Sequence, residues 1–181
     1  MNGSGYEAPR SVEETVALLK GANGNARILA GGTDLLAQMK TGAVSPELLV
    51  DVKKIPELVR IEANDAGGFR IGAAVCGAAL GEHQALREAW PGVVEATRLI
   101  GSEQIQGRAS LGGNLCNGSP AADSVPALIA AGAHCTIAGP DGSRDVAVED
   151  VVTGPGQICL APGELVVSFT LDKRSTRSGD A

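Results

Sequence analysis

The residues best suited to bind a ligand lie in one segment, residues 107–123, which reads G-R-A-S-L-G-G-N-L-C-N-G-S-P-A-A-D. Glycines allow positive φ angles and leave backbone N–H groups uncovered, so several of these groups can point together at an anion. The small hydroxyl and amide side chains that could orient a polar ligand are Ser110, Asn114, Asn117 and Ser119. The segment therefore predicts either a site for a polar, anionic ligand or an ordinary glycine-rich turn.

A second segment of the same kind, residues 27–36, favours the first of these alternatives. It reads as a buried strand, then the pair Gly31 and Gly32, then Thr33 and Asp34 at the start of a helix. Backbone donors at a helix start suit phosphate oxygens, and the Thr33 hydroxyl adds to them. Because two such glycine loops suit a ligand with a pyrophosphate in its middle, the sequence predicts a dinucleotide cofactor.

The cysteines and histidines form no recognisable site. No CxxC pair occurs among the four cysteines, which are Cys76, Cys116, Cys135 and Cys159. An iron–sulfur or zinc site within this chain is therefore not expected, and small buried thiols are the better interpretation. His134 lies next to Cys135, but neighbours on a strand point to opposite faces, which argues against a Cys–His nucleophile. We expect no catalytic residue and no metal ligand in this chain.

Composition excludes two further classes of function. The chain has 181 residues, a formal net charge of −6 and no stripe of Lys and Arg, so nucleic-acid binding is not expected. No apolar run approaches the length of a membrane span, and the N-terminus has no signal-peptide pattern. The sequence therefore predicts a soluble, cytoplasmic protein that does not contact a membrane. Since only 2% of the residues are aromatic, the core must be built from Ala, Val, Leu and Ile.

Hydrophobic periodicity predicts the elements that position the first glycine segment. They are a helix over 11–20, strands over 26–30 and 48–52, and a short helix from 35 to about 42. Ser11 and Glu14 fit a capping box at the start of the first helix. Leu35, Leu36 and Met39 are expected to form the buried side of the second helix. This order resembles half of a nucleotide-binding lobe, but it lacks the glycine patterns of an ordinary Rossmann domain or a P-loop NTPase.

The remaining elements are predicted to follow a junction at 53–56. They are a hairpin of 58–62 and 69–75, helices over 78–89, 92–100 and 125–131, and strands over 135–138, 144–148 and 164–171. On the last strand, Leu165, Val167 and Phe169 are expected to be buried at alternating positions. Residues 1–10 are expected to form a loose lead-in, 149–163 a loop, and 172–181 a polar, disordered end.

Two motifs, in this order and at this separation, match those of a known family. The first is A-G-G-T-D-L over 30–35, and the second runs from S-E-Q-I over 102–105 through S-L-G-G-N-L over 110–115 to S-P-A-A-D-S-V-P-A-L over 119–128. With these motifs the chain resembles the FAD-binding, medium subunit of the molybdenum hydroxylases, the xanthine dehydrogenase and carbon monoxide dehydrogenase group, over about residues 5 to 171. The resemblance implies an α+β, two-lobed FAD-binding fold of the vanillyl-alcohol-oxidase or PCMH type. Residues 1–55 would form the N-terminal α/β lobe, 56–173 the second α+β lobe, and 174–181 a disordered tail.

The resemblance also implies which residues hold FAD between the lobes. By position, the pyrophosphate and adjacent groups would be held by Ile28, Leu29, Ala30, Gly31, Gly32, Thr33, Asp34 and Leu35, and by Ser110, Leu111, Gly112, Gly113 and Asn114. Asp123 would contact the flavin-bearing part, and Val166 would line the cofactor pocket. Ile100 falls where relatives can place an aromatic residue near the ring, so stacking from this position is not expected.

Two glycines and two carboxylates carry specific expectations. A Cβ atom at Gly112 or Gly113 is expected to block the approach of the pyrophosphate while leaving the fold intact. Asp34 and Asp123 cannot lie directly against phosphates without repulsion. Each is expected to cap a helix or to hold a ribose or ring group instead.

The function implied by the resemblance is electron transfer. A molybdenum-cofactor large subunit would oxidise a substrate, a [2Fe–2S] small subunit would pass electrons on, and FAD on this chain would collect them for NAD or another acceptor. The alternative is an assembly module that docks to these partner subunits without holding FAD; a stand-alone FAD-dependent oxidase is less favoured, because it needs a substrate-binding domain. Family members usually continue into a small C-terminal domain, which we expect to be absent here because the sequence ends after Ala181.

Overall fold

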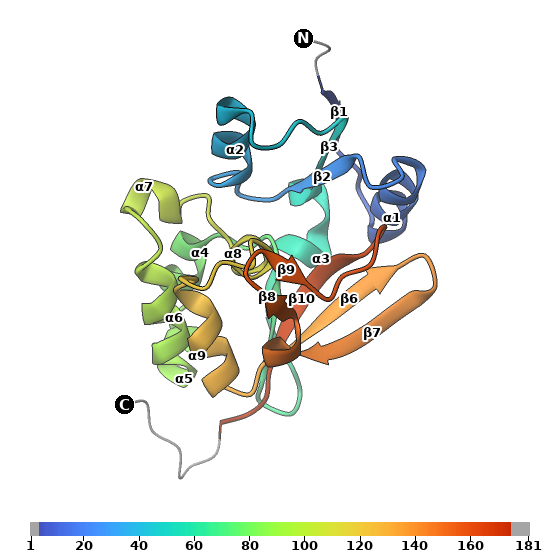
Figure 1. Ribbon diagram of the computed structural model, residues 1–181. Helices are drawn as coiled ribbons and strands as arrows, with labels where there is room; N and C mark the ends of the chain where they lie inside the picture. The colour runs from blue at the N-terminus through green and yellow to red at the C-terminus, as the bar shows by residue number, and fades with distance from the viewer. Residues whose placement is uncertain (1–3, 175–181) are drawn as a thin grey trace.

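The computed structural model describes residues 4–174, and its smaller sheet lies at the N-terminal end of the molecule (Figure 1). Three parallel strands form this sheet in the order β1-β3-β2, which are Gly5–Glu7, Leu48–Asp51 and Ala26–Leu29. Helix α1 (Val12–Gly21) links β1 to β2, and helix α2 (Leu35–Thr41) links β2 to β3. The first ten residues are therefore not only a lead-in, because β1 pairs with β3. Strand β1 was not predicted because its pairing is with a strand about forty residues away.

The larger sheet has five antiparallel strands in the order β4-β5-β10-β6-β7. These strands are Ile61–Ala63, Phe69–Gly72, Leu165–Leu171, His134–Gly139 and Gly142–Ala147. On the central strand β10, Leu165, Val167 and Phe169 are buried as predicted, but Val166 and Ser168 between them are buried too, so burial does not alternate. It is buried on both sides because Leu165 and Val167 pack in one core with the smaller sheet, whereas Val166 and Phe169 pack in another with the helices.

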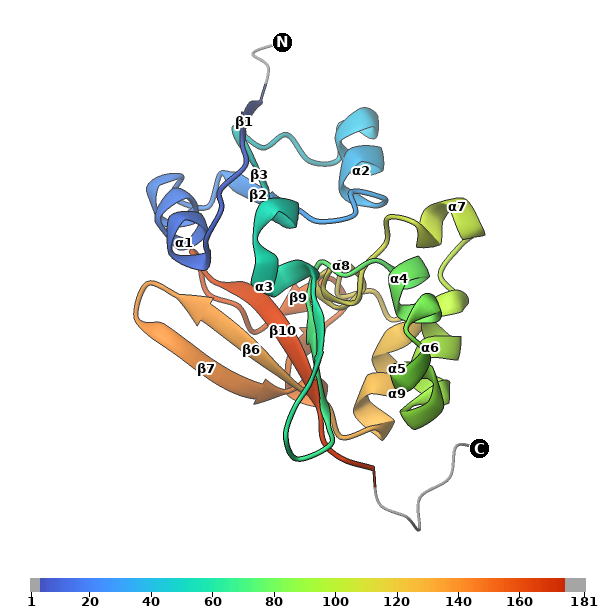
Figure 2. The same ribbon diagram turned by 180° about the vertical axis from the view of Figure 1, so that it is seen from behind.

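Most helices gather on one side of the larger sheet (Figures 1 and 2). They are α4 (Gly77–Glu82), α5 (Gln84–Ala89), α6 (Pro91–Arg98), α7 (Glu103–Gln106) and α9 (Ser124–Ala130). Helix α8 (Leu111–Cys116) lies nearer the middle of the molecule, and contacts α9 and β10. The short connecting elements are η1 (Val52–Lys54), α3 (Pro56–Val59), η2 (Val148–Asp150), β8 (Val152–Gly154) and β9 (Gln157–Ile158). Within residues 4–174, no helix is long and apolar enough to cross a membrane.

Three local predictions are corrected by the structure. The segment around Leu58 forms α3 instead of a strand, because Pro56 suits the first position of a helix. The helix predicted over 78–89 is two helices, since the Nδ1 atom of His83 accepts a hydrogen bond from the Leu86 amide and starts a new helix there (3.1 Å). The second glycine segment is not a loop, because residues 111–116 form α8.

The structure also tests the predicted start of α1 and reaches the first residue of the predicted C-terminal tail. Ser11 caps α1 as predicted, with its hydroxyl accepting a hydrogen bond from the Glu14 amide at 3.1 Å. The Glu14 carboxylate accepts from the Arg10 amide (2.7 Å), one residue earlier than a capping box requires. The tail predicted over 174–181 lies outside the described residues apart from Arg174, whose guanidinium carbon lies 5.5 Å from the centre of the Trp90 ring.

Candidate functional site

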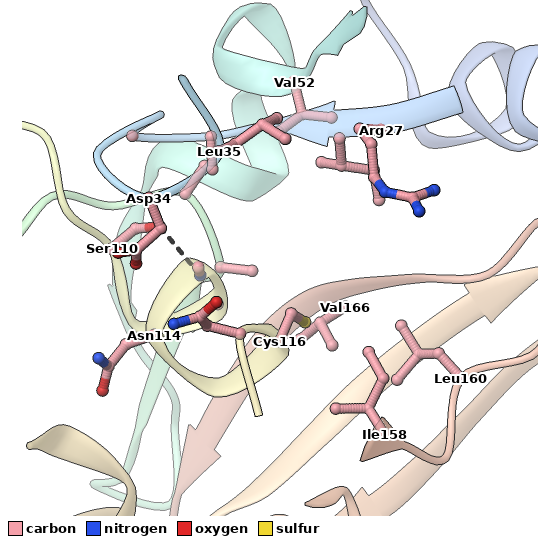
Figure 3. Close-up of a pocket in the computed structure, with 18 of the residues that line it drawn as sticks. Arg27, Asp34, Leu35, Val52, Ser110, Asn114, Cys116, Ile158, Leu160 and Val166 are labelled. Atoms are coloured by element: carbon pink, nitrogen blue, oxygen red, sulfur yellow. Dashed lines mark hydrogen bonds between the residues drawn. The ribbon is translucent and has the colours of Figure 1, made fainter. Parts of the chain in front are cut away.

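A cleft among the described residues has a volume of about 660 Å³. Its walls come mainly from three parts of the chain: β2 with the loop that follows it, helix α8, and the segment from 156 to 166 (Figure 3). The first part belongs to the smaller sheet and the last includes the central strand of the larger one. The cleft therefore lies where the two sheets meet.

At the wall of this cleft, the loop between β2 and α2 places a row of backbone amides without acceptors in the described part of the protein. Within the described residues, the amides of Gly31, Gly32, Thr33 and Asp34 donate no hydrogen bond to the protein, and all four residues line the cleft. Gly32 has a φ angle of +78°, which residues other than glycine rarely adopt. Successive uncovered amides of this kind form a concavity that binds anions.

The glycines of the two segments have different physical roles, which corrects one expectation. A Cβ atom on Gly112 would lie 2.6 Å from the Ala73 carbonyl oxygen, and one on Gly31 would collide with the Arg108 carbonyl oxygen. These two glycines are needed because segments of the backbone pack closely against them, so substituting Gly112 would disturb the fold. A Cβ on Gly113 would meet only the Ser110 hydroxyl, at 3.2 Å. Gly113 is therefore the position where bulk would enter the cleft.

Helix α8 presents two further polar groups whose orientation is fixed. The Ser110 hydroxyl accepts a hydrogen bond from the Gly113 amide (3.2 Å), capping the helix (Figure 3). The Asn114 Oδ1 atom accepts from the hydroxyl of buried Ser124 at 2.7 Å and from the Ser124 amide at 3.2 Å. Because the Ser124 amide can only donate, the atom facing it must be the oxygen. The two N–H groups of the Asn114 side chain therefore remain available to a ligand.

Neither predicted carboxylate caps a helix. Asp34 and Asp123 each precede a helix with helical backbone angles, and neither side chain bonds a backbone amide. Capping needs an extended residue at this position, so the expectation that they cap a helix is wrong, whereas the other expectation, that each holds a ribose or ring group, stays a prediction. Asp34 lines the cleft, whereas Asp123 is exposed and is not among the residues that line it.

Most of the other residues predicted for the site lie on the cleft wall. They are Ile28, Ala30, Leu35, Ile100 and Val166. The side chains of Leu29 and Leu111 are buried elsewhere and do not line it. Helix α2 has no buried residue, and Leu36 is 45% exposed, so the predicted buried side of this helix is wrong. Leu35 points to the cleft instead of to a core (Figure 3).

The wall formed by residues 156–164 was not predicted as part of the site. It contributes Ile158, Leu160 and Pro162, which make that side apolar. Its only signal in the sequence is the pair of Gly-Pro clusters at 154–156 and 162–163, which predict a loop but no contact with a ligand. Gln38 of α2 and Asn117 at the end of α8 also line the cleft, and the Gln38 Nε2 atom donates to Asn117 Oδ1 at 3.4 Å.

The thiol on the cleft wall is not a nucleophile. Burial, together with the nearby thiols of Cys135 and Cys159, raises the pKa of Cys116 to about 12. A thiol with this pKa stays protonated near neutral pH, and only the thiolate attacks or binds metals. Within residues 4–174, no group of three or more His, Cys, Asp or Glu side chains could hold a metal ion.

These residues fit a dinucleotide cofactor. The volume is in the range of small-molecule sites. One wall offers uncovered amides that suit a pyrophosphate, and the opposite wall is apolar and suits a ring system. The fold and the cleft together define a dinucleotide-binding protein.

Comparison with known proteins identifies the family. Residues 2–171 match the family described as "FAD binding domain in molybdopterin dehydrogenase". The chain is 35% identical over 164 residues to a carbon monoxide dehydrogenase medium chain of Hydrogenophaga pseudoflava, covering 91% of this chain and 57% of that one. It is 33% identical over 164 residues to a xanthine dehydrogenase FAD-binding subunit of Escherichia coli O157:H7, covering 91% and 56%.

A solved structure agrees with this result. The crystal structure of a Cu,Mo-CO dehydrogenase in its cyanide-inactivated form matches with a TM-score of 0.92 and 34% identity, over 96% of this chain and 60% of that one. The chain belongs to the family of FAD-binding domains in molybdopterin dehydrogenases, which confirms the family, the α+β FAD-binding fold and the cofactor that the motifs predicted. It spans less than two thirds of the length of these relatives.

Proposed function

We propose that this chain carries FAD as the electron-transfer subunit of a molybdenum-containing hydroxylase or dehydrogenase. The observation that carries the proposal is the row of four uncovered amides, Gly31 to Asp34, on the wall of a large cleft. The described residues contain no metal cluster, and the cleft wall offers no thiolate. The residues therefore support cofactor binding, with the redox chemistry left to the cofactor.

The residues of this chain would bind and orient the cofactor. The amides of the β2–α2 loop and the side-chain amide of Asn114 would donate to the pyrophosphate and adjacent groups. Ile100, Val166, Ile158 and Leu160 would exclude water from the ring. When bound, FAD supplies reversible electron transfer, and Ile100 leaves no aromatic stacking from its position. The predicted contact of Asp123 with the flavin-bearing part remains a proposal, and would need the cofactor to extend beyond the cleft described above.

The remaining expectations about the complex belong to the same proposal. The partners would be a molybdenum-cofactor large subunit and a [2Fe–2S] small subunit, and the acceptor NAD or another oxidant, in the cytoplasm. We also propose that 1–55 and 56–173 act as the two lobes that hold FAD. The names of the relatives, a carbon monoxide dehydrogenase and a xanthine dehydrogenase, support such a complex; they leave the substrate open.

The test is a visible absorption spectrum of the purified chain after incubation with FAD and desalting, with Gly113→Val as the variant. Retained flavin absorption is expected for the natural chain and a large loss for Gly113→Val, because the added side chain enters the cleft. Gly21→Val is the matched control, since a Cβ there meets nothing within 4 Å. A natural chain that retains no flavin would favour the alternative of an assembly module that docks without FAD. Equal flavin retention by Gly113→Val and the control would contradict the assigned site.

A further inference from the structure

The β2–α2 loop is held from behind by two cationic side chains that do not line the cofactor cleft. The Lys53 Nζ atom donates to the Ala30 carbonyl oxygen at 2.9 Å. The Arg108 Nε atom donates to the Gly31 carbonyl oxygen at 3.1 Å. Both side chains line a second hollow of about 250 Å³, and neither lines the cleft.

Because peptide groups are planar, these two contacts also fix the direction of the Gly31 and Gly32 N–H groups. Within residues 4–174 no peptide bond is cis, and in a trans peptide unit the C=O and the following N–H point in opposite directions. With the Ala30 oxygen held by Lys53, the Gly31 N–H faces away from the second hollow. With the Gly31 oxygen held by Arg108, the Gly32 N–H does the same. Gly31 lines both hollows, so the loop is the wall between them.

The two cations differ in how far their charge is compensated. Lys53 is paired with the Asp51 carboxylate at 2.7 Å, and the Tyr6 hydroxyl donates to that carboxylate at 2.7 Å. Burial raises the pKa of Asp51, but hydrogen bonds from Lys53 and Tyr6 outweigh this and hold the pKa below its usual value. Arg108 has no ion-pair partner among the described residues. Its charge is therefore the less neutralised of the two.

We propose that Lys53 and Arg108 are positioning residues for the pyrophosphate site: they hold two successive carbonyls so that the Gly31 and Gly32 amides face the anion. The inference rests on the proposed FAD site. A cation that donates to a carbonyl also polarises the peptide unit, which strengthens its N–H as a donor. The two side chains thus favour anion binding without contacting the anion, and Arg108 contributes more than Lys53.

The test uses inorganic pyrophosphate as the probe, with binding followed by the NMR amide signals of Gly31 and Gly32 in the otherwise unliganded chain. In the natural chain both signals are expected to shift on titration. Arg108→Met should weaken pyrophosphate binding by up to about tenfold, a limit set by the hydrogen bond that the charged guanidinium donates to the Gly31 carbonyl, and Lys53→Met should weaken it less. Arg108→Lys should recover part of the loss. Lys54→Met is the matched control. Lys54 is exposed, follows Lys53 directly and does not bond the loop, and its substitution removes the same charge.

The outcomes separate this inference from the proposed function. Equal affinity in Arg108→Met, Lys53→Met and Lys54→Met would show that only net charge acts, and would overturn the inference. A natural chain whose Gly31 and Gly32 signals do not respond to pyrophosphate would overturn it as well. A chain that binds pyrophosphate as expected but retains no FAD would contradict the proposed function and leave the positioning role supported.

Discussion

At the scale of single residues, the neighbouring glycines Gly112 and Gly113 look equivalent in the sequence but have different roles in the structure. Gly112 is buried against Ala73, where its amide donates to the Ala73 carbonyl at 3.0 Å and a side chain would collide. Gly113, the next residue, is exposed and lines the cleft. Both glycines fit the motif, but a substitution at Gly112 would report on packing. Only Gly113 reports on ligand access.

Two buried serines provide a matched test of what their hydroxyls do. Ser168 and Ser124 are both fully buried, but the Ser168 hydroxyl has no partner in the described structure, whereas the Ser124 hydroxyl donates to Asn114. Removing an unpaired buried polar group is neutral or stabilising, and removing a paired one costs about 1 kcal/mol. We therefore expect Ser168→Ala to keep or raise the free energy of unfolding, and Ser124→Ala to lower it.

Urea unfolding followed by the fluorescence of Trp90, the single tryptophan, measures both effects. Ser124→Ala should also weaken FAD binding, because Asn114 loses the shorter of the two hydrogen bonds that fix its side chain. Ser168→Ala should leave FAD binding unchanged, since Ser168 does not line the cleft. A clear loss of stability in Ser168→Ala would show that its hydroxyl has a partner, such as a buried water.

At the scale of elements, sequence reasoning worked where the determinants are local. The strand–glycine–helix order from β2 to α2 was predicted because the apolar run, the glycine pair and the polar helix start are consecutive. Helix α8 was missed because two adjacent glycines are poor helix formers. It forms because tertiary contacts replace propensity: Ser110 caps it and Gly112 hydrogen bonds to Ala73.

The part of the site that could not be predicted also depends on tertiary contacts. Residues 156–164 reach the cleft only because β10, which follows them, lies at the centre of the larger sheet. Likewise Lys53 and Arg108 meet the same loop through contacts with residues 23 and 77 positions away. No local pattern encodes these distances. The cofactor and the parts of the cleft formed by the β2–α2 loop and by residues 110–114 could therefore be predicted, whereas the wall formed by residues 156–164 and the support of the loop could not.

A buried thiol on strand β6, that of Cys135, leads us to expect that the free energy of unfolding decreases at alkaline pH. Burial of the Cys135 side chain, together with the nearby Cys159, raises the pKa of the thiol from 9.0 to about 11. Since the folded chain holds this proton more tightly than the unfolded chain, the stability from it is complete below about pH 9 and is lost as the pH rises toward 11. Each pH unit in this window costs about 1.4 kcal/mol for one thiol.

This dependence is measured by urea unfolding at a series of pH values from neutral to alkaline. Cys135→Ala should be less stable at neutral pH because a buried group is lost, but its stability should fall less steeply above about pH 9. Cys116 contributes a slope of its own through its raised pKa, so the dependence should not vanish. The same slope in Cys135→Ala and the natural chain would contradict the assignment to this strand.

At the scale of the whole molecule, the cleft joins two sheets that otherwise have separate cores. The smaller sheet packs with Leu165 and Val167, and the helices pack with Val166 and Phe169, so β10 is shared by both cores. A ligand between the glycine loop and residues 156–164 would add contacts to both sides at once. FAD binding should therefore stabilise the chain as one unit.

The prediction is that the free energy of unfolding rises with FAD concentration, by about 2.7 kcal/mol at a free concentration about 100 times Kd. Hydrogen exchange should slow on both walls: at Gly31 and Gly32, whose amides have no protein acceptor, and over residues 156–164. The hairpin of β6 and β7, neither of which lines the cleft, measures the stabilisation of the whole chain, so the local effect is the slowing of exchange in excess of that seen in the hairpin. Protection of the glycine loop alone would mean that the second wall does not contact the cofactor, and that the ring lies outside the cleft between the sheets.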